Sequence, residues 1–460
     1  MNSAILIAIF AYFIFFIALA VFVSRNTKKE SAESFFLNNR RTGTLKFFLS
    51  SLAAVISAAG TIGVFTEANR SGISFGIGAV IGTTLGLLAI SILTHQIFRF
   101  GKEFDAVTIV DFARIRFGRR TAKLVAFLQV ILLVAWIVTQ AVVFSYLIGS
   151  LSGVGFELAL FFSLGLTLIY TTIGGMKVDL LSDCFQAVMI FVFLLVLLVI
   201  LWSQEEMISA LFAEIPISHF MPLAFGGFKW LLPAIFFGPV IIFGNTINWQ
   251  RTFSARTGEV ARTGFYLAAP LFFLVGTTMI FLGLISIHFL GVNFGDGAFY
   301  AFLKEALPGW AQIIAVFGTL SIVVSSIDSL LLGGAAILQR EFFSKGEGTS
   351  RDARLSTFFF GIFAFLVTLF FRDLVELTLW AGYLSGAIAI PLVIGLVWRG
   401  LPSRAAFWAI IGGVITVFAT FPFLGIDTLI PVLFVIFSAL IIGILLPGKE
   451  PSHSQLLPSE

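Results

Sequence analysis

Apolar residues run along this chain in long segments, and polar residues gather in the short stretches between them. A helix needs roughly 20 mainly apolar residues to cross a hydrocarbon core about 30 Å thick. Thirteen segments fit approximately: 4–23, 45–70, 72–98, 122–150, 156–175, 180–202, 228–249, 263–290, 309–338, 355–372, 374–398, 404–422 and 427–447. Backbone polar groups inside a membrane must be paired, and the alternating pattern of a membrane barrel is absent. The pattern therefore predicts an all-α multispanning membrane protein with about thirteen transmembrane helices.

Composition excludes a water-soluble protein. Hydrophobic residues make up 59% of the 460, charged residues only 11%, and the mean hydropathy is +1.06. A soluble domain carries about 25% charged residues, which this chain lacks. The net charge of +4 is not gathered into a basic cluster, so we expect no nucleic-acid partner. The lipid bilayer is the predicted surrounding, and we expect a monomer.

The positions of lysine and arginine predict the orientation. Basic residues are enriched in cytoplasmic loops. If the N-terminus lies outside and the C-terminus inside, 24 of the 28 basic residues fall on the cytoplasmic side. We therefore expect a plasma-membrane protein, of a bacterial inner membrane, with a cytoplasmic tail at 448–460.

Two of the predicted helices carry residues that interrupt a helix. The second span holds Gly60 and Gly63 in a stretch of small and hydroxyl residues, and the seventh holds Pro233 and Gly238-Pro239. Proline removes a backbone hydrogen bond, and transporters break helices where ions and solutes bind at mid-membrane. Gly78, Gly82 and Gly86 on the third span indicate close helix packing instead.

The two interrupted spans are five spans apart, which predicts two repeats. Because five is odd, the second repeat must have inverted topology. The predicted organisation is an extra helix at 1–23, a five-helix repeat at 45–202, an inverted repeat at 228–398 and two further helices at 404–447.

Polar side chains inside two other spans suggest a cation site. Ser325, Asp328 and Ser329 share one face of the ninth span, with Ser326 beside them. Hard cations prefer oxygen ligands, and an ionisable residue in a span is a functional candidate by default. The alternative for the serines is a hydrogen bond to their own helix. Asp183, on the sixth span, has the alternative of a favourable position at a helix N-terminus. Asp179 and Lys177 are expected at the solvated interface.

At these residues the chain resembles the sodium:solute symporter family. The most specific match runs from Tyr170-Thr171-Thr172-Ile173-Gly174-Gly175-Met176-Lys177 through Ser182-Asp183 to Gln186. Three further matches follow the family order: Ser34-Phe35-Phe36-Leu37 with Arg40, Trp249-Gln250-Arg251 with Ala261-Arg262, and Ser325-Ser326-Ile327-Asp328-Ser329. The resemblance extends from about residue 30 to 400.

The resemblance implies a LeuT-like fold with a five-plus-five inverted-repeat core and Na⁺ as the coupling ion. It implies a Na⁺ site formed by the carbonyls of Ala53, Ile56 and Ile322 and the hydroxyls of Ser325 and Ser326. A possible second Na⁺ or H⁺ site would use Asp183, Asp328 and Ser329, although Asp328 replaces a serine of the family pattern.

The solute is less well defined by the sequence. The resemblance places solute at Val55, Ser57 and Gly60, and it places Ala79 where sugar carriers have an acid. A sugar is therefore disfavoured, and a small amino acid or carboxylate is the expected small organic solute. Further candidates to bind it are Gln129, Phe243, Asn245 and Tyr383.

The predicted function is Na⁺-coupled symport by alternating access, with no enzymatic activity. The nearest alternative is a proton-coupled symporter of the same fold, using Asp183 and Asp328. Another alternative is a transporter-derived solute sensor, which the short tail disfavours. A membrane enzyme is disfavoured because the sequence has no nucleophile–base pair or metal motif.

Overall fold

The computed structural model describes residues 3–25, 31–203, 214–295, 297–343, 348–371 and 374–446. Within these ranges the chain is helical, with no β-strand and only two isolated β-bridges, Ser31 with Thr349 and Thr42 with Ala255. The all-α prediction is therefore confirmed. The predicted cytoplasmic tail at 448–460 lies outside the described residues.

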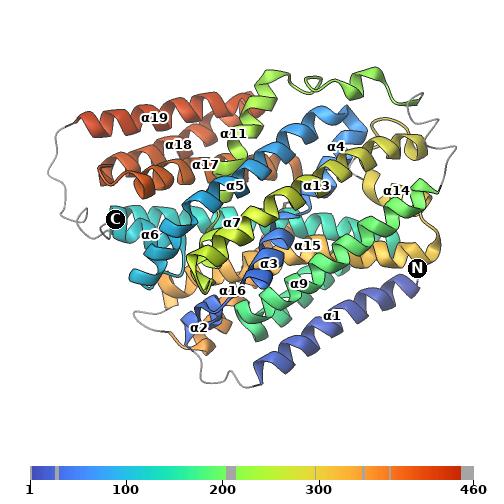
Figure 1. Ribbon diagram of the computed structural model, residues 1–460, viewed down its shortest axis with the longest axis horizontal. Helices are drawn as coiled ribbons and strands as arrows, with labels where there is room; N and C mark the ends of the chain where they lie inside the picture. The colour runs from blue at the N-terminus through green and yellow to red at the C-terminus, as the bar shows by residue number, and fades with distance from the viewer. Residues whose placement is uncertain are drawn as a thin grey trace.

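The longer helices run side by side along one common direction (Figure 1). Helix α1 lies beside α9 at one edge, and the paired helices α18 and α19 lie at the opposite edge. The α-helices are α1 (Ser3–Ser24), α2 (Ala32–Leu37), α3 (Thr44–Val55), α4 (Val64–Ser71), α5 (Ile73–Glu103), α6 (Ile109–Phe117), α7 (Arg119–Ser152), α8 (Phe156–Leu160), α9 (Leu166–Trp202), α11 (Phe228–Gly244), α12 (Thr246–Ser254), α13 (Gly258–Leu290), α14 (Ala298–Ala306), α15 (Gly309–Leu338), α16 (Ser350–Thr368), α17 (Leu374–Val397), α18 (Ser403–Leu424) and α19 (Leu429–Leu445). The π-helical and 3-10 segments are η1 (Asn38–Arg40), η2 (Ala59–Gly63), η3 (Phe161–Gly165), η4 (Ile217–Phe220), η5 (Gln339–Phe343) and η6 (Gly425–Thr428).

Eight of the described helices are long and apolar enough to cross a membrane, or up to ten if each of two bent pairs is one span. Helix α19 is a shorter apolar helix, and α16 begins with three charged residues in its first five positions. The exact number of thirteen spans therefore stays a prediction.

The predicted spans 156–175 and 180–202 are joined without a loop. The chain from Phe156 to Trp202 is helical throughout except at Gly175, whose φ of 59° and ψ of −159° favour glycine. The contacts with α1 are Phe10 with Phe162 and Ser24 with Ile173 before this glycine, and Phe15 with Phe185 after it. The segment before Gly175 therefore runs in the same direction as α1, because residue numbers rise together in both. The segment after Gly175 runs in the opposite direction. The chain therefore turns back at the Gly174-Gly175 pair.

Two helices are broken, and each is the first helix of a predicted repeat. Helix α3 meets η2 and α4 at a bend of 55°, and α11 meets α12 at a bend of 54°. The first break, at 56–58, lies just before Gly60. The expected site of the second break was wrong, because α11 continues through Pro233 and Pro239 and ends at Gly244. The division into two repeats stays a prediction.

Glycines bring α11 against α5, as the third span predicts. A methyl group at Gly82 would overlap the backbone of Ala234, and one at Gly238 would overlap the backbone of Gly82. The two backbones therefore touch directly, which larger side chains would prevent. Gly238 is therefore needed for close packing of α11 against α5, and it does not mark a break in α11.

Helices α15 and α7 form the centre of the bundle. The apolar segment of α15 is 83% buried and that of α7 78%, whereas that of the peripheral helix α18 is only 28% buried. Ser325, Asp328 and Ser329 therefore lie in the protein interior and not against lipid.

Candidate functional site

The first helix break lies against the serines of α15. Ser325 Oγ donates a hydrogen bond to the carbonyl of Ala53 at 3.0 Å and lies 3.3 Å from the carbonyl of Ile322. Ser326 Oγ donates to the neighbouring carbonyl of Ala54 at 3.3 Å. The structure therefore brings together four of the five predicted Na⁺ ligands, from two helices that are about 270 residues apart.

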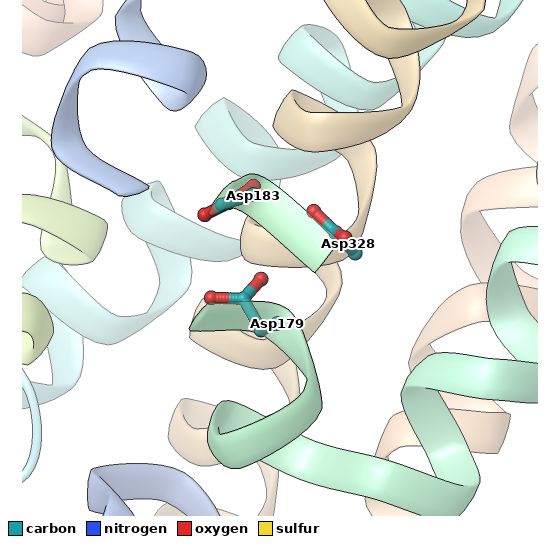
Figure 2. Close-up of side chains that lie close together, drawn as sticks. All are labelled: Asp179, Asp183 and Asp328. Carbon is teal, nitrogen blue, oxygen red and sulfur yellow. The ribbon is translucent and has the colours of Figure 1, made fainter. Parts of the chain in front are cut away.

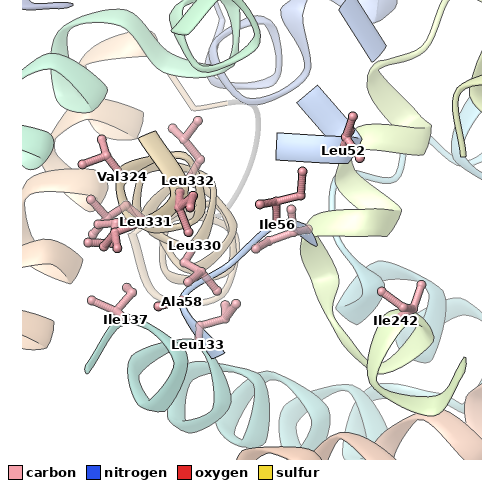
Figure 3. Close-up of a cluster of buried hydrophobic side chains, with 14 of the residues drawn as sticks. Leu52, Ile56, Ala58, Leu133, Ile137, Ile242, Val324, Leu330, Leu331 and Leu332 are labelled. Atoms are coloured by element: carbon pink, nitrogen blue, oxygen red, sulfur yellow. The ribbon is translucent and has the colours of Figure 1, made fainter. Parts of the chain in front are cut away.

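The remaining predicted ligand, Ile56, is itself one of the residues at the break. Its side chain is fully buried, and apolar side chains of α3, α7 and α15 gather around the break (Figure 3). Gln140 of α7 completes the surroundings, because its Oε1 accepts a hydrogen bond from the Ala58 N–H at 2.9 Å. Ala58 lies directly before η2, where the helix resumes after the break, and the first N–H groups of a helix have no partner within that helix.

A cluster of three carboxylates lies one helical turn from the serines. Asp179 and Asp183 of α9 lie close to Asp328 of α15 (Figure 2), and one oxygen from each lies within 4.8 Å of the others. All three side chains are buried. Asp328 Oδ2 accepts hydrogen bonds from the Tyr170 hydroxyl at 2.7 Å and the Ser182 hydroxyl at 3.3 Å. The expectation that Asp179 is solvated was wrong, whereas Lys177 is exposed as expected.

The cluster contains a positive charge, Arg251 of α12. Its Nη2 donates to Asp183 Oδ2 at 2.9 Å and to Ser329 Oγ at 2.6 Å, and lies 3.8 Å from Asp179 Oδ2. The side chain is only 1% exposed. Arg251 was one of the 24 basic residues counted in cytoplasmic loops, but the structure places it inside α12, in the bent pair α11–α12, with its side chain buried. Burial of charges on this scale requires close pairing.

The second helix break is bridged by Gln129 of α7. Its Nε2 donates to the carbonyl of Gly244 at 2.6 Å, and its Oε1 accepts from the N–H of Thr246 at 3.3 Å. Asn245, between them, accepts from the N–H of Ile247 at 3.1 Å and so caps α12. Two glutamines of α7, Gln129 and Gln140, therefore supply hydrogen-bond partners to free backbone groups at the two breaks.

A cavity of about 260 Å³ lies between the two breaks. Aromatic side chains dominate its walls: Phe75, Trp136, Trp230, Phe237, Phe272 and Tyr383. The polar lining residues include Ser57, Gln140, Asn245, Asn248, Arg251 and Ser326. Arg251 is the only charged one among the described residues, and no carboxylate lines the cavity.

The cavity includes most of the predicted solute-binding residues. Val55, Ser57, Gly60, Asn245 and Tyr383 line it, as does Ala79. Gln129 and Phe243 do not. Gln129 is fully buried with both ends of its amide in use, and the carbonyl of Phe243 accepts a hydrogen bond from Trp249 Nε1 at 2.9 Å.

Sequence reasoning missed the parts of the site that depend on long-range contacts. Arg251 was noted only within a motif match and among the basic residues assigned to the cytoplasmic side, and Asp179 was placed at the solvated interface. One signal was present for both residues, since a charge next to an apolar span is a functional candidate. For the two glutamines, nothing in the sequence connects either one with a particular helix end.

Comparison with known proteins shows the family and the fold of this chain. The family model of the sodium:solute symporter family matches residues 35–413. The sodium/pantothenate symporter of Escherichia coli (strain K12) is 23% identical, over 96% of each chain. A Na⁺-coupled sialic acid symporter, solved in a substrate-bound outward-open state, has a TM-score of 0.77 at 16% identity, over 97% of this chain and 99% of that chain. The nucleobase-cation-symport-1 family transporter Mhp1 has a TM-score of 0.56 at 15% identity, over 88% and 94%. The predicted LeuT-like fold is thereby confirmed.

Proposed function

Because this chain belongs to the sodium:solute symporter family, we propose that it couples inward movement of Na⁺ to uptake of a small organic carboxylate. It is a multi-pass membrane transporter and not an enzyme. The observation that carries the finer proposal is the cavity between the two broken helices, whose lining has a buried arginine and, among the described residues, no acidic one.

The chemistry of the cavity favours an anionic solute with an apolar body. Trp136 Nε1 and Arg251 Nη1 are both buried and find no acceptor among the described residues, although both residues line the cavity. Two such N–H donors suit carboxylate oxygens. The aromatic walls suit apolar surface of the solute. A cationic solute would meet the like charge of Arg251 and no carboxylate among the described lining residues, and a sugar would leave many hydroxyls without partners.

We propose that Na⁺ binds at the first break. The carbonyls of Ala53 and Ile322 already converge on Ser325 Oγ, and a hydroxyl can turn a lone pair toward a cation when its proton rotates away. The ion would then join α3 to α15, with further oxygens from Ile56 and Ser326. The cavity and this site share Ser326, so ion and solute would stabilise one arrangement of the same helices.

We also propose the orientation that the basic residues predict, with the N-terminus outside. The cavity residues Phe75, Trp230 and Thr378 lie near the starts of α5, α11 and α17. In this orientation those helix ends face outward, so the cavity belongs to an outward-facing state. Two ion pairs lie toward the opposite ends of the helices, Arg114 with Glu341 and Arg340 with Asp111 at 3.1 Å. They would have to separate for release of solute to the cytoplasm.

Uptake into proteoliposomes tests the proposal. The purified chain is reconstituted, and an inward gradient of Na⁺ or of H⁺ is imposed with a panel of labelled carboxylates, amino acids, sugars and polyamines. We expect uptake of a carboxylate under the Na⁺ gradient, increased by an inside-negative potential, because moving one charge through 100 mV releases about 2.3 kcal/mol. Uptake that follows the H⁺ gradient without Na⁺ would favour the alternative, a proton-coupled carrier using the carboxylate cluster.

A further inference from the structure

Arg251 has contacts that solute binding does not explain. Arg251 lines the cavity, but the partners of its Nη2 and Nε are residues outside the cavity lining. Nη2 lies between Asp183 Oδ2, Ser329 Oγ and Asp179 Oδ2, at 2.9, 2.6 and 3.8 Å, and Nε donates to Ser50 Oγ at 2.9 Å. The guanidinium therefore binds oxygens from α3, α9 and α15 at once.

Two of these oxygens belong to the predicted second Na⁺ site. Asp183 and Ser329 are two of its three predicted ligands, and Nη2 is within hydrogen-bond distance of both. Hard cations bind oxygen at short range, about 2.3–2.6 Å for Ca²⁺. A sodium ion bound to both oxygens would therefore compete with Nη2 for one position. Arginine stays protonated in proteins, so the two cations would also repel each other strongly at low dielectric.

The third predicted ligand, Asp328, lies beside this position but is hydrogen-bonded to other groups. Asp328 Oδ2 accepts from the hydroxyls of Tyr170 and Ser182, and its Oδ1 accepts from the backbone N–H of Ser329 at 2.8 Å. Both oxygens of Asp328 therefore have donors that do not involve a metal ion. Arg251 contacts the two aspartates of α9 and not Asp328.

We infer that the guanidinium of Arg251 takes the place of a second sodium ion, so that each chain binds a single Na⁺, at the first helix break. This inference rests on the proposed function, because it counts the ions of the proposed symport. A cation that is part of the chain neutralises the aspartates of α9 but is not released with the solute. Removing it exposes Asp179, Asp183 and Ser329 to a cation from solution.

Equilibrium binding of radiolabelled Na⁺ to the purified full-length chain, without any solute, tests the inference. We expect the wild type to bind one Na⁺ without cooperativity. Arg251→Gln should bind two, because the side chain amide supplies no charge. Arg251→Lys should stay at one, because it keeps a cation on the chain. Arg262→Gln is the matched control, since Arg262 is an exposed arginine whose side chain is 58% accessible.

The possible results separate this inference from the proposed function. Two ions bound by the wild type, or a single ion bound by folded Arg251→Gln, would overturn the inference while leaving sodium coupling intact. Absence of any Na⁺ binding to the wild type would overturn both. If Arg251→Gln fails to fold, the wild-type count alone decides, because one ion supports the inference and two contradict it.

Discussion

The two broken helices have nearly the same bend, 55° and 54°, but their free backbone groups are satisfied in different ways. At the first break the carbonyls of Ala53 and Ala54 accept from hydroxyls of α15. At the second, the carbonyl of Gly244 and the N–H of Thr246 both bond to the amide of Gln129. The two breaks therefore have similar bends, but their free backbone groups have different hydrogen-bond partners.

This difference decides which break can bind a cation. A serine hydroxyl both donates and accepts, so it can exchange its hydrogen bond to a carbonyl for a metal contact by rotating its proton. The NH₂ group of Gln129 is a donor only, and it points at the carbonyl that a cation would need. The first break therefore suits the proposed Na⁺ site. At the second break, the hydrogen bonds of Gln129 stabilise the junction between α11 and α12, which we call the structural joint.

The largest effect is expected from removing the hydroxyls at the first break. In Ser325→Ala/Ser326→Ala, two oxygen ligands are lost, each contributing about 1.5–3 kcal/mol as a bond to a charged group. We expect Na⁺ affinity to fall by roughly 100-fold or more, at 1.4 kcal/mol for each tenfold step. Na⁺-dependent uptake in proteoliposomes at fixed solute concentration should fall to background.

Thr319→Ala is the matched control for the serine variant. Thr319 is a buried hydroxyl residue on the same helix, but it bonds the carbonyl of Ala315 in its own helix at 2.7 Å. Its removal should leave the Na⁺ dependence of uptake unchanged. Full Na⁺-dependent uptake by the double serine variant would contradict the ion site and the contrast between the two breaks.

Gln129→Leu should affect stability and not ion binding. Leucine is similar in size but leaves the carbonyl of Gly244 and the N–H of Thr246 without partners, at about 1–3 kcal/mol for each group. We expect a loss of roughly 2–6 kcal/mol in the free energy of unfolding. Thermal unfolding of the purified variant should show a lower melting temperature, with an unchanged Na⁺ dissociation constant. A selective loss of Na⁺ affinity at normal stability would contradict the proposed joint.

Gln140→Leu should give a smaller and mixed effect, because Gln140 accepts a hydrogen bond at the break proposed to bind Na⁺ and also lines the cavity. One backbone N–H, that of Ala58, loses its acceptor, which costs about 1–3 kcal/mol. We expect the apparent affinities for both Na⁺ and solute to fall, since the break can no longer hold its shape. Gln140→Glu keeps the acceptor and should keep Na⁺ affinity. Equal loss in both variants would mean that the hydrogen bond to Ala58 is not what matters.

Much of the fold follows from the sequence because a bilayer allows few alternatives. Apolar segments of about 20 residues predict helices, and nearly every expected segment corresponds to a described helix. The exact ends of helix interruptions were harder to predict. Pro233 and Pro239 do not end α11, because neighbouring groups can accommodate proline within a membrane helix.

Within the site, the sequence pattern singles out residues on one helix but gives no sign of contacts between distant helices. Ser325 and Ser326 come from their positions on the predicted ninth span and from the family resemblance, and their role as Na⁺ ligands stays a prediction. The pairing of Arg251 with Asp179 and Asp183 needs α12 to reach α9, which no local pattern indicates. The same holds for Gln129, which was expected to bind solute and instead bridges Gly244 and Thr246.

The smallest effect concerns Asn245, the one residue of the second break that also lines the cavity. Asn245→Ala removes the cap of α12 and should lower the free energy of unfolding by about 1 kcal/mol. Asn245→Asp keeps a capping oxygen, so its melting temperature should stay close to that of the wild type. The added carboxylate should repel an anionic solute in a cavity whose lining has no other acid. Uptake of a carboxylate should therefore weaken in Asn245→Asp while Na⁺ binding is kept. Unchanged or stronger uptake of the carboxylate in that variant would contradict the assignment of this cavity to an organic acid.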